Sequence, residues 1–149
     1  MKEKITAYNL RVYGLLIDRE RRILISCEER NGFKFTKFPG GGHQLGEGLI
    51  ETLRREFKEE LGIGIDDLKH FYTTDFFQLS AFNSSQQVFS FYYLVDSAEA
   101  KQIKDGFHAL DESEGNSNCF YWRKLNQLEP ADFTFPIDQL VLKKLKKEI

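Results

Sequence analysis

Hydrophobic positions in the first third of the chain predict three β-strands. The runs KITAYNLRVYGLLID and RILISCEE are rich in Ile, Leu, Val and Tyr, flank the charged segment DRERR and are typical of a β-hairpin. The segment FKFTKFPG indicates a third strand, because it alternates Phe33 with Phe35 and ends at Pro39. The first two strands are therefore expected to pair with each other.

A helix is predicted over Gly48 to Leu61. Apolar residues recur there at intervals of three and four, the spacing of a buried stripe on an α-helix. The residues of this stripe are Ile50, Leu53, Phe57 and Leu61. Gly62 supplies the helix stop.

Each residue of an α-helix turns the chain by about 100° about the helix axis. On this geometry Glu56, Glu59 and Glu60 occupy an arc of about 100° beside the buried stripe. Carboxylates three and four positions apart repel each other, and each exposed pair lowers the stability of the helix by roughly 0.2–0.5 kcal/mol. A hard divalent cation such as Mg²⁺ would offset this repulsion. Helices rich in Glu, Arg and Lys are more often solvated faces stabilised by ion pairs. Glu51 and Arg55 fit that alternative, but the like charges of Glu56 and Glu60 at i,i+4 do not.

The rest of the chain alternates strands with a final helix. LKHFYTTDFFQLSAF and QQVFSFYYLVD indicate two aromatic strands joined by the polar turn NSSQ. Their aromatic residues are interpreted as core, namely Phe76, Phe77, Phe89, Phe91, Tyr92 and Tyr93. The polar segment at residues 97–118 is expected to be a short helix or an excursion with a loop, CFYWRKL a strand, and PIDQLVLKKLKKEI an amphipathic helix. This order indicates an α/β or α+β sandwich around a mixed sheet, in one domain covering residues 1–149.

Composition excludes several classes of function. The 149 residues carry 21 basic and 23 acidic side chains, a net charge of −2, so no nucleic-acid partner is indicated. The apolar run GLLI is too short for a signal sequence or a membrane span, so we expect a cytoplasmic protein without a membrane partner. Cys27 and Cys119 form no disulfide framework or metal cluster and are interpreted as ordinary strand or core residues.

The segment GGHQLGEGLIETLRREFKEELGI, residues 41–63, resembles the Nudix box of the Nudix hydrolases. Its glycine, its glutamate and the run REFxEExGI occur in register, and the preceding FPGGG resembles the Pro-Gly-Gly of that family. Phe57 is bulkier than the usual aliphatic residue, and Gln44 replaces a frequent glutamate. The likeness also includes the VYGLLID strand and the tryptophan-containing strand with its terminal helix, and so covers most of the chain.

The resemblance implies a fold, a reaction and a set of site residues. The fold is a Nudix-type α/β/α sandwich with a mixed β-sheet between helices. The reaction is Mg²⁺- or Mn²⁺-dependent cleavage of the diphosphate linkage of a nucleoside diphosphate joined to another group, by attack of a metal-activated water at phosphorus. The catalytic residues that it implies are Glu47, Arg55, Glu56, Glu59 and Glu60, with Glu56, Glu59, Glu60 and the main-chain carbonyl of Gly40 as metal ligands.

Arg55 has a supporting role in this scheme, because a guanidinium has no acceptor for a metal but can hold Glu47 and Glu59 in place. The base that takes the proton of the water is one of the box glutamates or an acid of a later loop. Asp111, Glu112 and Glu114 are the candidates there, and Glu114 is preferred. The remaining predicted substrate contacts are Phe35, His43, Trp122 and Asp138; each is also compatible with a purely structural or exposed position.

Two alternatives to the enzyme remain open. One is a non-catalytic Nudix-like module that binds a nucleotide and has a regulatory function, and the other is a salt-bridged interaction domain without metal. For both the enzyme and the regulatory module, the expected partner is a small nucleotide or nucleotide derivative. A homodimer is also possible, because members of the family often dimerise. Leu79 stands where ADP-ribose-specific relatives have a proline, which disfavours ADP-ribose as the substrate.

Overall fold

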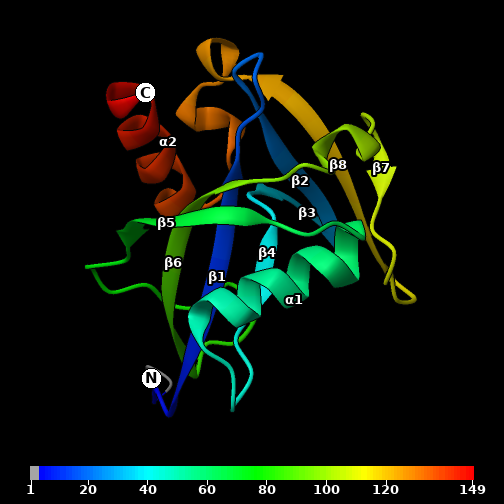
Figure 1. Ribbon diagram of the computed structural model, residues 1–149. Coiled ribbons are helices and arrows are strands. Elements are labelled where there is room, and N and C mark those ends of the chain that lie inside the picture. Colours follow the sequence, from blue (N-terminus) through cyan, green and yellow to red (C-terminus); the bar gives the residue numbers. More distant parts are fainter. Residues whose placement is uncertain (1–3) are drawn as a thin grey trace.

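The computed structural model describes residues 4–149 and contains two four-stranded sheets and two α-helices (Figure 1). The first sheet has the order β4-β1-β6-β5, with β1 at Ala7–Leu16, β4 at Gly40–Gly42, β5 at Asp66–Thr73 and β6 at Gln86–Asp96. The second has the order β3-β2-β8-β7, with β2 at Arg22–Arg30, β3 at Phe33–Lys37, β7 at Phe107–His108 and β8 at Asn116–Lys124. The helices are α1 at Leu49–Leu61 and α2 at Pro136–Glu148.

The first sheet is mixed, as predicted. Strand β1 pairs in parallel with β6 along its whole length and antiparallel with the short glycine strand β4. The register of the parallel pair runs from Ala7 opposite Gln86 to Leu16 opposite Val95. Strand β1 therefore lies in the interior of the sheet and positions both the glycine strand and β6.

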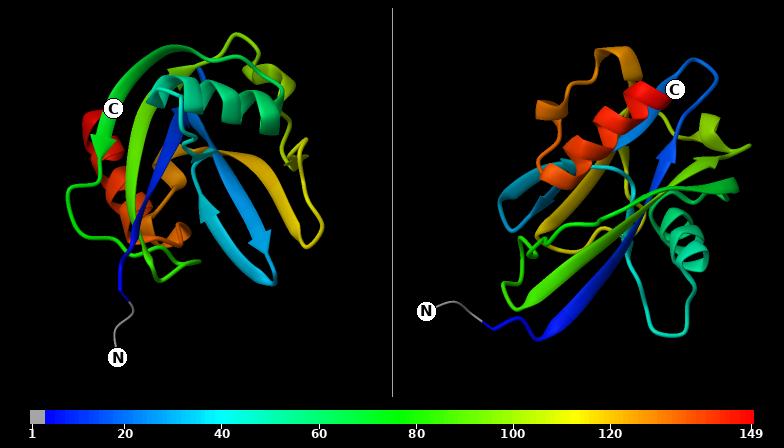
Figure 2. Two further views of the ribbon diagram at one scale, coloured as in Figure 1. Left: turned by 90° about the horizontal axis from the view of Figure 1, so that it is seen from below. Right: turned by 90° about the vertical axis from the view of Figure 1, so that its left-hand side faces the viewer.

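The two helices cover opposite sides of the strands. Val12 and Leu16 of β1 lie in the hydrophobic core that α1 covers, whereas Tyr13 and Leu15 lie in the core that α2 covers. Because successive side chains of a strand point to opposite faces, this division places the helices on either side (Figure 2). The expected Nudix-type sandwich with a mixed sheet between helices is confirmed.

Helix α1 confirms the predicted helix and both of its ends. Gly48 precedes it, and the N–H of Gly48 donates to the carboxylate of Glu51 at 3.0 Å. Gly62 follows it with a φ of 70° and donates its N–H to the carbonyl of Lys58 at 3.0 Å. Glycine adopts this left-handed conformation without a steric cost, which is why the helix ends there.

The buried stripe of α1 differs from the prediction at one position. Leu53, Phe57 and Leu61 are at most 3% exposed, as expected, but Ile50 is 41% exposed. Leu49 packs against the core in its place. The first turn of α1 follows an exposed loop, so only one of its two adjacent apolar residues reaches the sheet.

The predicted hairpin of the first two strands is wrong. Strands β1 and β2 belong to different sheets, and the bridge between Ile17, just after β1, and Ile23 is isolated. The turn between them does form, since the N–H of Arg21 donates to the carbonyl of Asp18 at 3.1 Å. The sequence thus predicted the turn after β1, but β1 takes β6 as its long parallel partner and does not pair with β2.

The first aromatic strand is shorter than predicted. Strand β5 ends at Thr73, and residues 74–85 form a loop before β6. Phe76 and Phe77 lie in this loop and are 39% and 59% exposed, so their interpretation as core is wrong. Aromatic composition favoured a strand, but only the pairing with β6 decides where β5 ends.

The remaining elements agree with the sequence. Strand β8 and helix α2 lie where a strand and a closing helix were predicted, and residues 97–118 hold a short 3₁₀ helix at Ala100–Gln102 and the two-residue strand β7. Further 3₁₀ turns lie at Leu125–Gln127 and Pro130–Asp132. Cys27 and Cys119 are free and lie in β2 and β8. Within residues 4–149, none of the helices has the length and apolar character needed to cross a membrane.

Candidate active site

The glycine strand β4 forms one side of the candidate site. Gly40 lies opposite Tyr13 of β1 and has a φ of 149°, and a Cβ at this position would overlap the carbonyl oxygen of Val12. A Cβ at Gly41 would overlap the carboxylate of Glu56 on α1. Only glycine therefore allows the main chain to approach β1 on one side and this carboxylate on the other.

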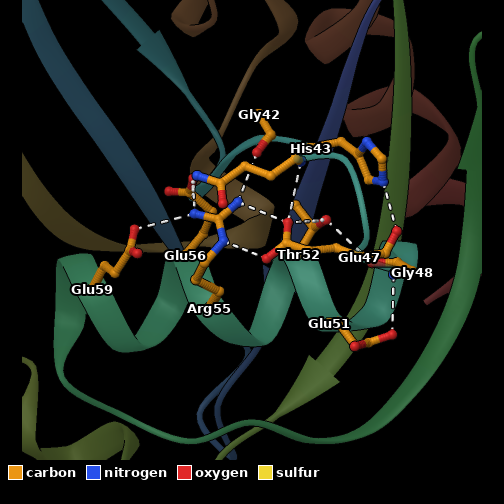
Figure 3. Close-up of polar contacts among 10 residues, drawn as sticks. Gly42, His43, Glu47, Gly48, Glu51, Thr52, Arg55, Glu56 and Glu59 are labelled. Carbon is orange, nitrogen blue, oxygen red and sulfur yellow. Dashed lines mark hydrogen bonds and ion pairs between the residues drawn. The ribbon is translucent and has the colours of Figure 1, made fainter.

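Arg55 joins the glycine loop to α1 through a network of hydrogen bonds (Figure 3). Its Nε and Nη2 donate to the two carboxylate oxygens of Glu47 at 2.6 and 3.0 Å, and Nη2 also donates to the carbonyl of Gly42 at 2.9 Å. Its Nη1 donates to Glu56 at 3.0 Å and to Glu59 at 3.2 Å. Because the guanidinium donors are fixed in one plane, Arg55 orients three carboxylates at once.

Glu47 is held in its ionised form. Hydrogen bonds from Arg55 lower the pKa of Glu47 to about 2, and further donors are the hydroxyl of Thr52 at 3.0 Å and the N–H of Gln44 at 3.2 Å. Nε2 of His43 lies 2.7 Å from the main-chain carbonyl of Glu47, an oxygen that can only accept, so this nitrogen carries the proton. One ring nitrogen of His43 is therefore engaged by the loop itself.

Glu56 and Glu60 lie in poorly hydrated positions that disfavour their charged forms. Burial raises the pKa of Glu60 to about 7, Lys37 opposes the shift, and the charge of Glu56 adds to it. Burial also raises the pKa of Glu56, which Arg55 opposes. The side chain of Glu59 is 46% exposed and lies at the outer edge of the same face. Nearby positive charge stabilises the ionised forms of such carboxylates.

This donor set fits a hard divalent cation. Carboxylate and carbonyl oxygens are the ligands that Mg²⁺ prefers, and the absence of a side chain at Gly41 brings the main chain beside Glu56. Across residues 4–149, no three side chains of His, Cys, Asp or Glu are gathered into a complete metal site. Mg²⁺ does not need one, because it usually takes one or two protein carboxylates and completes its shell with water and substrate phosphate.

A cavity of about 180 Å³ is lined by residues of β1, β2, β3, β6, the loop before β6 and the start of α2. Phe35 and Asp138, both predicted substrate contacts, line it, as do Arg11 and Lys37. Lys37 lowers the pKa of both Glu60 and Asp138, so its charge acts on the glutamate face and on the cavity. The cavity and the acidic face are thus electrostatically connected.

The structure does not bring Trp122 to this cavity. Its side chain is 7% exposed and packs in the core that α1 covers, and its indole N–H donates to the carbonyl of Ile103 at 2.8 Å. These contacts give Trp122 a structural position in β8. Its position relative to the family pattern suggested a substrate contact, but the side of the sheet that Trp122 faces follows from the register of β8 against β2.

The loop acid that acts on the glutamate face is Asp111. Its charge contributes to the raised pKa of Glu60, and the N–H of the preceding Leu110 donates to the carbonyl of Glu60 at 2.9 Å. Glu112 is engaged with His108 at 3.2 Å. Glu114, the acid preferred from the sequence, is exposed in the same loop. Of these three loop acids, Asp111 is the one whose charge reaches Glu60.

Comparison with known proteins agrees with this geometry. The chain matches the family described as NUDIX domain over residues 7–144, which is most of its length. The chain belongs to the NUDIX domain family. It is a Nudix hydrolase, and residues 41–63 are its Nudix box.

Solved structures with the same fold include other members of this family. A MutT Nudix hydrolase from Burkholderia pseudomallei is 17% identical, with a TM-score of 0.69 over 93% of this chain and 98% of the other. A MutT from a study of Aliivibrio salmonicida and Vibrio cholerae is 22% identical, with a TM-score of 0.62 over 95% and 98%. The ORF135 protein of E. coli is 16% identical, with a TM-score of 0.69 over 95% and 91%. No curated protein matches the chain.

Several polar residues around the Nudix box were not found from the sequence. Thr52 is buried and its hydroxyl lies 3.0 Å from Glu47, while Lys37 is 4% exposed and Arg11 contributes to the cavity wall. Lys37 directly precedes the Phe-Pro-Gly turn, which was an available signal. Arg11 had none, because only the pairing of β1 with β4 brings it opposite Gly42.

Asp138 is a buried acid of the cavity wall. It is 2% exposed, and the hydroxyl of Tyr92 donates to it at 2.6 Å. Burial raises the pKa of Asp138 to about 7, although the Tyr92 bond and Lys37 oppose the shift. Folding therefore favours the protonated form of this side chain between its unfolded and its folded pKa.

The free energy of unfolding of the metal-free protein is expected to fall as the pH rises from about 4 to about 7. The folded state binds the proton of Asp138 in this window and the unfolded chain, with a pKa near 3.9, does not. Above pH 7 both states are ionised and this contribution is constant. Asp138→Asn should make the slope shallower by at most about 1.4 kcal/mol per pH unit, measured by urea unfolding in EDTA.

The pKa of Glu60 is also raised by folding, so the free energy of unfolding of Asp138→Asn should still fall with pH, but less steeply than in the wild type. Asp66→Asn, at an exposed position of β5, is the control and should keep the wild-type slope. An unchanged slope in Asp138→Asn would contradict the assigned burial effect.

Proposed function

We propose that this Nudix hydrolase cleaves the diphosphate linkage of a nucleoside diphosphate joined to another group, with Mg²⁺ or Mn²⁺ as its cofactor. The observation that carries the proposal is the close approach of the main chain at Gly41 to the carboxylate of Glu56. Glu59 and Glu60 extend the same acidic face. The family membership and the MutT-like fold of the solved structures support the reaction class.

In this proposal Glu56, Glu59, Glu60 and the carbonyl of Gly40 hold the metal ion. When bound, the ion supplies positive charge to the diphosphate and lowers the pKa of a water molecule. Arg55 keeps the carboxylates oriented by its hydrogen bonds. A carboxylate of this face, or Asp111 beside it, accepts the proton of the attacking water.

The cavity accommodates the nucleoside end of the substrate. Phe35 supplies an aromatic wall and Asp138 a polar one, and both line the space. Arg11 and Lys37 place positive charge between this wall and the glutamates, where the phosphates of a bound nucleotide would need it. His43, with one ring nitrogen bound to the loop, would contact substrate only through its other nitrogen.

A substrate panel tests the proposal. The protein is incubated with Mg²⁺ and nucleoside triphosphates, oxidised dGTP, ADP-ribose, dinucleoside polyphosphates and nucleotide sugars, while release of phosphate, pyrophosphate or nucleotide is followed. We expect turnover of at least one compound and its loss with EDTA, with ADP-ribose among the poorer substrates. Restoring Mg²⁺ or Mn²⁺ should restore turnover.

Binding without turnover would identify the alternative, a Nudix-like module with a regulatory function. Calorimetry with the same panel detects this outcome. The absence of both binding and turnover would contradict the proposal. We further infer a cytoplasmic location, and light scattering at several concentrations tests whether the protein forms a homodimer.

A further inference from the structure

The two cysteines of the chain lie directly opposite each other in the second sheet. The 149 residues include no further cysteine, and both thiols are free and partly exposed. The register of β2 against β8 places Cys27 opposite Cys119, although the two residues are far apart in the sequence. Side chains directly opposite each other in an antiparallel pair point to the same face, so both thiols lie on one side of the sheet.

The hydrogen bonds of this strand pair indicate how close the two main chains are. The N–H of Asn31 donates to the carbonyl of Gly115 at 3.1 Å, in the same register as the strand pair. Hydrogen-bonded positions recur at every second residue pair of an antiparallel ladder, so Cys27 and Cys119 occupy one of them. Opposite Cα atoms at such a position are about 5.5 Å apart. This separation lies within the range of roughly 4.4–6.8 Å that a disulfide spans.

Each thiol has a contact on the strand at its other side. Sγ of Cys27 lies 4.0 Å from the hydroxyl of Thr36 on β3, and Sγ of Cys119 lies 3.4 Å from Nδ1 of His108 on β7. These four residues form a row across the four strands of the sheet. Rotation about χ1 turns each sulfur from its outer contact toward the other cysteine, and such rotations are fast for side chains that solvent reaches.

The surroundings of Cys119 favour an uncharged sulfur. Burial raises the pKa of the Cys119 thiol, and negative charge on Glu112 and on Cys27 raises it further. The contribution of Cys27 reflects the closeness of the two sulfur atoms. Two neighbouring thiolates repel each other, whereas a disulfide carries no charge. His108 lies near enough to take the proton that Cys119 loses when it reacts.

We propose that Cys27 and Cys119 form a reversible disulfide site, with a low-molecular-weight disulfide such as oxidised glutathione as the oxidant. The thiolate of one cysteine attacks a sulfur of oxidised glutathione, which forms a mixed disulfide and releases one glutathione. The second cysteine attacks the protein sulfur of the mixed disulfide, forms the bond between the two strands and releases the other glutathione. The two protons that the cysteines lose end on the two glutathione thiols, so one disulfide is consumed for the one that forms.

The geometry of the strand pair also makes the bond reversible. Cβ atoms of directly opposite residues are about 4.5–5.5 Å apart, whereas a disulfide needs roughly 3.5–4.5 Å. Closing the bond therefore draws the strands together, and a strained, partly exposed disulfide is readily reduced by thiols. Neither Cys27 nor Cys119 is among the residues that line the cavity, and the inference does not depend on the proposed function.

Equilibration in glutathione buffers tests this site. The folded protein is held in mixtures of reduced and oxidised glutathione without air, quenched with acid and analysed by mass spectrometry. We expect a species that is lighter than the reduced protein by two hydrogen atoms and carries no glutathione, and dithiothreitol should reverse its formation. Its proportion in each mixture gives the effective concentration of the two thiols. In urea that unfolds the chain, this effective concentration should be at least about tenfold lower, because only chain diffusion brings the thiols together.

Single variants separate the two steps of the exchange. Cys27→Ser and Cys119→Ser each retain one thiol, so the mixed disulfide with glutathione should persist in them, because no second thiol can resolve it. Asp66→Asn, in the other sheet, retains both cysteines and should behave as the wild type. The yield of the disulfide in the wild type should not depend on the protein concentration.

Three results with the wild type would overturn the inference. The first is a folded protein that keeps two unreacted thiols, or a persistent glutathione adduct, in oxidised glutathione. The second is a disulfide-linked dimer whose yield rises with the protein concentration. The third is an equal effective concentration in the folded and the unfolded protein, since the sheet would then not bring the cysteines together. None of these results involves hydrolysis of a nucleotide, so they leave the proposed function unaffected.

Discussion

Replacing Glu59 by glutamine is expected to lower kcat by about 10²- to 10⁴-fold, with little change in the free energy of unfolding. Glutamine keeps the shape of the side chain but loses the charge that a metal ligand or a base requires. The side chain of Glu59 is 46% exposed, and its ion pair with Arg55 spans 3.2 Å. Exposed pairs contribute at most about 1 kcal/mol to stability, so a loss of activity would reflect chemistry.

Glu51→Gln is the matched control for this variant. Glu51 lies on the same helix and is exposed, and its carboxylate accepts from the N–H of Gly48, which the oxygen of a glutamine can also do. Steady-state kinetics at saturating Mg²⁺ should show wild-type kcat for this control. Thermal unfolding of both variants should coincide with that of the wild type. A Glu59→Gln protein that retained wild-type kcat would refute the assignment of Glu59 to the active site.

Replacing Gly40 by alanine is expected to lower the free energy of unfolding by about 3 kcal/mol or more. The added Cβ would overlap the carbonyl oxygen of Val12 and also crowd Tyr13 of β1. These atoms belong to a central strand, so they cannot move aside as a flexible side chain would. The φ of 149° adds strain for any residue other than glycine. Urea unfolding measures the loss.

Gly32→Ala separates steric overlap from the conformational effect alone. Gly32 also has a positive φ, of 85°, but nothing lies within 4 Å of the position that a Cβ would take. We expect this control to lose only about 1–2 kcal/mol. Equal losses in the two variants would show that the approach of β4 to β1 is looser than the structure indicates.

Local patterns were sufficient to predict the acidic helix of this protein. A helix of this length repeats its geometry every few residues, so the sequence alone places Glu56, Glu59 and Glu60 on one face. The stop at Gly62 also depends only on neighbouring residues. Arg55 could be predicted to reach Glu47 and Glu59, because the family motif places all three within one loop and one helix.

Pairing between distant strands could not be predicted in the same way. The number of residues between two strands does not determine whether they share a sheet. Strand β1 pairs with β6, which is distant in the sequence, and not with β2, which follows it directly. Phe76 and Phe77 have the residue type of a core strand but lie beyond the end of β5. Several strands can form hydrogen bonds to the same strand edge, and the local sequence pattern does not indicate which of them pairs there.

By itself, the sequence determined the secondary structure of α1, the turns at its ends and the shared helix face of Glu56, Glu59 and Glu60, because these depend on contacts within a few residues. Only the tertiary structure decided which residues form the cavity. Arg11, Lys37 and Gln78 come from three separate segments, and they line one cavity because β1, β3 and the loop before β6 pack together. The position of Trp122 was decided in the same way, since burial in the core fixes which side of β8 it occupies.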